Sequence, residues 1–223
     1  MFIRKIEFLL AISFASTIFS SCNLTKLGPY YTFKENAEVV RCNTGRFNLL
    51  MGIRSKEVIR LSNLARRNPD LLRKYIKHMY GEKWVEMSGV KNLRNSKNKK
   101  PLLRPSYLLY SSAKIHSIAS GVTGYEGHRG FLARIFVFGN LNCIFEGAGE
   151  NCSYGSWRAI GQFTSWMGST GHRANILNEK FYRIGQGSFP HINYATNSVQ
   201  CFSGPKILDV LLRPQVVFRK KNN

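Results

Sequence analysis

The fold of this 223-residue chain is decided by the stretch Gly147-Ala148-Gly149-Glu150-Asn151-Cys152 and, twenty residues later, by Gly171-His172-Arg173-Ala174-Asn175-Ile176-Leu177-Asn178. The two stretches carry an acid, a histidine and several amide or guanidinium groups beside glycines. Because glycine has no Cβ, backbone can approach a ligand closely there. They therefore mark a candidate site.

Helices are predicted before and between these stretches from the spacing of apolar residues. Residues 55–67 place apolar side chains roughly on one face, and Asn68-Pro69 starts a second helix, with Asn68 as its N-cap and Gly81 as its stop. Residues 106–120 form a further helix, apolar on most sides and therefore buried. Another helix follows Ser156.

The remaining segments are predicted to be strands, turns or loops. Residues 131–138 are apolar enough for either a helix or a strand, and periodicity does not decide between them. Residues 88–104 are rich in lysine and arginine, which predicts an exposed basic loop. Residues 169–178 are predicted as a turn leading into further structure, and Pro190 and His191 as a loop. The predicted strands are 150–154, 183–189 and 197–202.

Seven short motifs in a fixed order resemble the CAP family, named after cysteine-rich secretory proteins, antigen 5 and pathogenesis-related 1 proteins. Besides Gly-Glu-Asn and Ser-x-Gly-His-Arg-x-Asn-Ile-Leu-Asn, they are 61–69, 102–106, Gly127-His128 with Arg134, Ile184-Gly185-x-Gly187 and 198–202. The resemblance covers residues 53–204. It implies an α+β fold, a three-layer α-β-α sandwich with a central, mainly antiparallel sheet.

The resemblance also implies a groove that holds two histidines and two acids. The first histidine falls on His128, the acid of Gly-Glu-Asn on Glu150 and the second histidine on His172. The second acid is missing, because residues 156–167 contain neither Asp nor Glu, and Gln162 is the nearest polar candidate. Ligand-binding residues are accordingly expected at His128, Glu150, Asn151, His172 and Arg173.

Two chemistries suit this residue set. Imidazole nitrogen and carboxylate oxygen are good ligands for zinc or another divalent metal, and a metal-activated water can attack a carbonyl. Without a metal, Glu150 would act as general base and a histidine as acid. Purely structural roles are the alternative to both chemistries. His172 and Arg173 would then hydrogen-bond to backbone carbonyls, and Glu150 would form an ion pair with Arg134 or Arg173. The asparagines are expected to cap turns, and His116 and His191 to be packed or exposed rather than functional.

The cysteines allow two interpretations. Apart from Cys22, four cysteines remain, an even number that suggests two disulfides in an exported chain, with Cys152–Cys201 as the preferred pair. All four can equally be free, because buried cysteine packs as a small hydrophobe. Cys152 lies two residues after Glu150, so on a strand both side chains point to the same face.

The N-terminus has the pattern of an export signal. Arg4 and Lys5 precede an apolar run at 8–19 that is too short to span a bilayer comfortably. Ser20-Ser21-Cys22 resembles a lipobox, in which the cysteine is lipidated, although Phe19 replaces the usual leucine. This predicts a signal peptide at 1–21, a lipid-anchored tether and lead-in at 22–52, a domain at 53–204 and a basic tail at 205–223. The alternative is a secreted protein cut near the same place.

The formal net charge is +21, and +20 if the chain starts at Cys22. Such charge favours contact with anionic lipids, lipopolysaccharide or glycans, or is simply a solvated surface. Aromatics are not interleaved with the basic loop, which argues against a nucleic-acid site. Three functions stay open for a monomeric envelope protein: a ligand- or metal-binding domain, a metal-dependent hydrolase of peptides or envelope polymers, and a basic adhesin whose binding collapses with salt.

Overall fold

A mixed, mostly antiparallel sheet forms the centre of the domain in the computed structural model, which describes residues 52–95, 100–139 and 147–204. Its strand order is β1-β3-β4-β2. β1 (Arg104–Pro105) pairs in parallel with β3 (Arg183–His191). β4 (Tyr194–Ser203) pairs antiparallel with β3 and with β2 (Ala148–Tyr154), so β2 is an edge strand.

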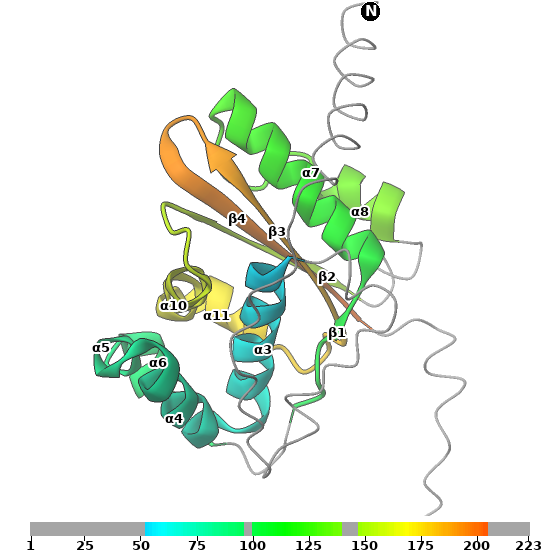
Figure 1. The fold of residues 1–223 in the computed structure, drawn as a ribbon. Coiled ribbons are helices and arrows are strands. Elements are labelled where there is room, and N and C mark those ends of the chain that lie inside the picture. The colour runs from blue at the N-terminus through cyan, green and yellow to red at the C-terminus, as the bar shows by residue number, and fades with distance from the viewer. Residues whose placement is uncertain (1–51, 96–99, 140–146, 205–223) are drawn as a thin grey trace, which may run out of the picture. The chain divides into compact units, whose positions relative to one another are not determined.

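Helices cover both faces of this sheet (Figure 1). Helices α7 (Tyr107–Thr123) and α8 (Phe131–Gly139) lie on one face, and α3 (Ile53–Arg67), α10 (Ala159–Gly168) and α11 (Thr170–Leu177) lie on the other. Helix α4 and two short helices pack against the second layer: α4 (Pro69–Tyr80), α5 (Glu82–Val85) and α6 (Ser88–Lys91). The predicted α-β-α sandwich is confirmed.

Two glycines of β3 let α7 lie very close to the sheet. A Cβ on Gly185 would lie 2.0 Å from backbone atoms of Leu109 and Tyr110, and one on Gly187 would lie 2.7 Å from backbone atoms of Lys114. Real side chains do not tolerate such contacts, so only glycine permits this spacing. The close approach fixes the position of α7, including the residues that it turns toward β2.

The opposite sheet face carries a line of polar side chains, here called the amide chain, which is buried except for the half-buried Asn175. Asn175 Nδ2 donates to Asn151 Oδ1 (2.9 Å), Asn151 Nδ2 to Gln200 Oε1 (3.1 Å), and Gln200 Nε2 to Ser62 Oγ (3.4 Å). Ser62 Oγ then donates to the carbonyl of Val58 (2.9 Å). Buried amides are stabilising only when they are bonded in this way, so the amide chain links α3, β4, β2 and α11.

Arg66 ties the second helical layer together. Its side chain is almost fully buried and donates to four backbone carbonyls at 2.8–2.9 Å, those of Pro101, Ile176, Asn178 and Phe181. Burial lowers its pKa to about 10. A guanidinium offers five donors in a rigid fork, which lysine cannot reproduce.

Most predicted helices are confirmed. Asn68 caps α4, where its side chain accepts from Leu71 N at 3.0 Å, and Ser106 caps α7. The ambiguous segment after Gly130 is the helix α8. The segment after Ser169, predicted as a turn, is the eight-residue helix α11, because Ser169 caps it by accepting from His172 N at 3.5 Å.

Three boundaries differ from prediction. The helix after Ser156 begins only at Ala159, because Gly155 has a positive φ of 95° and the next residues finish the turn. The basic segment 88–104 is not all exposed loop: it starts with α6, and Leu103 is buried with its N–H and carbonyl bonded to the Asn63 side chain. β3 continues through Pro190 and His191, where a loop was predicted.

Part of the predicted organisation lies outside the described residues. The signal peptide, the tether and the basic tail are among them, as are Cys22, Cys42 and Cys143. Within the described ranges, no helix has both the length and the apolar character that crossing a bilayer requires.

Candidate metal and ligand site

Glu150 is the centre of the site. Its side chain is 1% exposed, on the face of β2 toward α7 and α8. His128 Nδ1 lies 3.0 Å from Oε1, and Arg134 Nη2 donates to Oε2 at 2.6 Å. The structure thus brings His128 and Glu150 together, and of the two arginines considered as ion-pair partners it selects Arg134.

The imidazole of His128 is oriented by this carboxylate. A carboxylate oxygen accepts hydrogen bonds, so at this contact the proton lies on Nδ1 of His128. The other nitrogen, Nε2, then has a free lone pair on a side chain that is 51% exposed. Gly127, with φ at +89°, shapes the turn that carries this ring over β2.

His172 approaches from the other layer. It lies in the first turn of α11, and its backbone carbonyl accepts from Asn151 Nδ2 at 3.1 Å. Burial, and then the charge of His128, lower the pKa of His172. Because β2 is an edge strand, groups from the two layers can approach each other beyond it. The two imidazoles lie within electrostatic reach of each other. Within the described residues, the hydrogen bonds of His172 run through its backbone.

Three predicted polar residues are structural instead. Asn151 is fully buried in the amide chain, so it does not cap a turn. Gln162, the candidate for the missing acid, is also buried, donating to the carbonyl of Ser156 at 3.0 Å and accepting from Gln186 at 3.3 Å. Arg173 Nη1 donates to the carbonyl of Met167 at 2.7 Å, which is the carbonyl-binding role considered for it.

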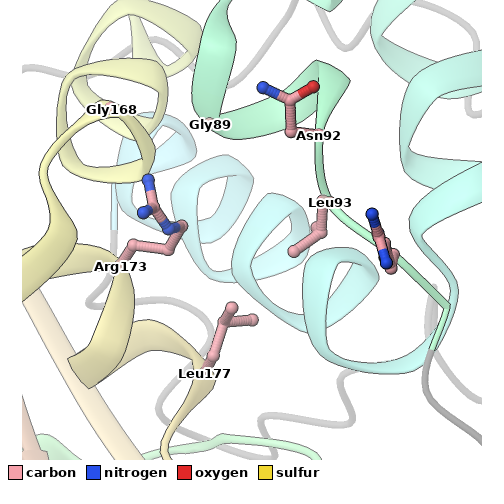
Figure 2. A pocket seen from close by; sticks show the side chains of 7 residues that line it. Gly89, Asn92, Leu93, Gly168, Arg173 and Leu177 are labelled. Atoms are coloured by element: carbon pink, nitrogen blue, oxygen red, sulfur yellow. The ribbon is translucent and has the colours of Figure 1, made fainter.

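Arg173 also lines a pocket of about 480 Å³ in the second helical layer (Figure 2). In that view Arg173 and Leu177 lie across the opening from Asn92 and Leu93. His128, Glu150 and His172 are not among the residues that line this pocket. Arg173 therefore does not join the predicted ligand-binding set around Glu150.

His116 was expected to be packed or exposed rather than functional; it is packed, and it lies beside the Glu150 carboxylate. It is 1% exposed on α7, with Nε2 3.9 Å from Glu150 Oε1 and 3.7 Å from Cys152 Sγ. Burial lowers its pKa. The sequence does contain a signal: Leu109, Ala113, His116 and Ser120 follow helical spacing and share the buried face of α7.

The predicted disulfide between Cys152 and Cys201 is wrong, because both are buried free thiols. Cys201 is paired in register with Glu150, and Cys152 with Val199. The two cysteines are therefore diagonal neighbours, about 7–8 Å apart, too far for a disulfide. The Glu150 carboxylate lies between them, 3.8 Å from Cys152 Sγ and 3.6 Å from Cys201 Sγ.

Comparison with known proteins agrees with this architecture. Residues 72–200 match the cysteine-rich secretory protein family, CAP, and the chain belongs to that family. It is similar in fold to an extracellular protein containing an SCP domain from Bacillus anthracis str. Ames, with 20% identity and a TM-score of 0.47 over 68% of this chain and 40% of that chain. It is also similar to a cysteine-rich secretory protein from Staphylococcus aureus subsp. aureus Mu50, with 14% identity and a TM-score of 0.43 over 67% of this chain and 38% of that chain.

This chain therefore spans less than half the length of either bacterial protein. At these identities the likeness concerns the fold alone. A search of curated proteins found no match.

Proposed function

We propose that this protein is exported, held at the bacterial envelope through a lipidated Cys22, and binds a divalent metal ion or small ligand in a groove formed by His128 and His172. Binding rather than turnover is the function that the geometry supports best. The observation that carries the proposal is the pair Glu150–His128, in which the carboxylate fixes the ring and leaves Nε2 facing outward. Carboxylate-oriented imidazoles of this kind are typical of metal-binding histidines.

The alternative, a hydrolase with Glu150 as its base, fits less well. A general base must reach the proton that it removes, directly or through one water. Both Glu150 oxygens are already bonded, to His128 and Arg134, and the side chain is 1% exposed.

The electrostatics of His172 support the same function. Burial and the nearby His128 lower the pKa of His172. A lowered pKa keeps the imidazole neutral at neutral pH, and the neutral ring is the form that binds metals. The missing second acid is consistent with a site of two nitrogen donors.

Calorimetric titration of the purified protein with Zn²⁺ tests the groove. We expect His172→Ala and His128→Ala each to weaken binding by at least about tenfold, since even loss of an outer-shell partner costs 10–100-fold. His78→Ala, on the exposed side of α4, is the matched control and should bind as wild type does. Unchanged binding in both groove variants, or metal-restored hydrolysis of peptide or envelope polymers by the wild type, would refute the proposal.

The basic adhesin is a second candidate, motivated by the net charge of +21. It predicts binding to anionic vesicles that weakens steeply with added salt, because exposed charges are screened. Vesicle co-sedimentation at low and high ionic strength checks this. Binding that is indifferent to salt would remove the candidate.

A further inference from the structure

Beneath the groove, three buried side chains with good metal-ligand atoms point toward one another. His116 comes from α7, and Glu150 and Cys152 come from alternate positions of β2, which puts both on one face of the strand. Their ligand atoms lie within 4.8 Å of one another, and all three residues are buried. The groove function explains Glu150 but gives no role to His116 or Cys152.

The three atoms form a nearly regular triangle. Cys152 Sγ is 3.7 Å from His116 Nε2 and 3.8 Å from Glu150 Oε1, and Nε2 is 3.9 Å from Oε1. The centre of such a triangle lies about 2.2 Å from each corner, which matches zinc–nitrogen and zinc–oxygen bonds of about 2.0–2.2 Å and zinc–sulfur bonds of about 2.3 Å. A tetrahedral ion lies out of the plane of the three atoms, so they must draw a few tenths of an ångström closer together to bind it.

We propose that His116 Nε2, Glu150 Oε1 and Cys152 Sγ bind a thiophilic divalent metal ion of the zinc class, here called the deep site. The fourth tetrahedral position is left to a water, as in three-ligand zinc sites. On binding, the Cys152 S–H bond breaks, its proton passes to solvent, and a sulfur–metal bond forms. The deep site shares Glu150 with the groove, but the groove uses neither His116 nor Cys152.

The surrounding groups suit such a site. Tyr125 Oη lies 3.1 Å from His116 Nδ1 and can accept a hydrogen bond from it when the proton moves to Nδ1, which frees Nε2 for the metal. Glu150 Oε1 has a second lone pair for His128 Nδ1, and Oε2 keeps Arg134. In the structure the carbonyl of Gly127 accepts from Nε2 at 2.9 Å and from Sγ at 3.4 Å, and metal binding would replace these two hydrogen bonds.

A nucleophilic role for Cys152 is disfavoured by its surroundings. Burial, and next the charge of Glu150, raise the pKa of the Cys152 thiol. Thiolates, not thiols, are the nucleophilic form, so this cysteine is inert as an attacking group. A bound cation reverses that balance, because a coordinating thiol is deprotonated.

Titration of the purified full chain with Co²⁺ under reducing conditions tests the deep site. We expect a sulfur-to-cobalt charge-transfer band in the near ultraviolet that saturates at one equivalent. Cys152→Ser should abolish the band, and His116→Gln should weaken cobalt binding by at least about tenfold. Circular dichroism establishes that each variant is folded.

Two controls separate the possible outcomes. Cys201→Ser removes the other buried thiol that touches the Glu150 carboxylate, and it should keep the band. His172→Ala impairs the groove and should also keep the band, so failure of the groove is distinguishable from failure of the deep site. A folded wild type without the band, or a band that persists in Cys152→Ser, overturns the proposal.

Discussion

Replacing Arg134 by methionine is expected to lower the free energy of unfolding by about 3–5 kcal/mol, because it leaves the buried Glu150 carboxylate without its counter-ion. The two side chains are 12% and 1% exposed, and their ion pair is 2.6 Å long. Urea denaturation followed by circular dichroism measures the loss. An effect of this size is a large fraction of the stability of a typical domain.

A neutral partner should rescue the variant. In Arg134→Met/Glu150→Gln the buried charge is gone, so we expect most of the lost stability to return. Arg158→Met, which removes the same charge from an exposed side chain, is the control and should change stability little. A loss below about 1 kcal/mol for the single variant, as for a surface ion pair, would contradict this account.

Gly185→Ala is expected to destabilise the fold by about 3 kcal/mol or more, because overpacking of a rigid contact is costly. The added methyl would lie 2.0 Å from backbone atoms of Leu109 and Tyr110, and neither can move without shifting α7. The same shift would carry His116 away from β2. Thermal unfolding measures the loss of stability, and cobalt titration measures the weakened deep site.

Gly171→Ala is the matched control for this substitution. A Cβ at Gly171 meets nothing within 4 Å, and the residue lies in α11 without a positive φ. Alanine favours helix over glycine by up to about 1 kcal/mol, so stability should be unchanged or slightly raised. If Gly185→Ala were as stable as wild type, α7 could move away from β3 at little cost, which would contradict the rigid contact between them.

Local sequence signals predicted much of the fold. The side chains of Asn68 and Ser106 cap helices α4 and α7, and the ring of Pro69 favours the first helical position. These signals are local, so the predicted helix starts are correct. The period of two along β2 placed Glu150 and Cys152 on one face. The order of the family motifs predicted the three layers, which no single element could indicate.

The rest depends on contacts between distant segments. His116 reaches Glu150 only because two glycines of β3 admit α7 so close to the sheet. The cysteine count could not reveal that Cys152 and Cys201 are offset by two residues in the β2–β4 register. Arg173 and Asn151 find their partners in other helices and strands, so nothing in their own segments distinguishes these bonds from ligand contacts.

The direction of the amide chain has a consequence for how this family can diverge. Each side chain from Asn175 to Gln200 donates a hydrogen bond to the next member of the chain. Each member after Asn175 also accepts a hydrogen bond from the member before it. Exchanging Asn151 for an apolar residue would strand a donor on Asn175 and an acceptor on Gln200 at once. We therefore expect descendants of this domain to inherit these positions as a block, or to lose them together through compensating changes, rather than to drift one residue at a time.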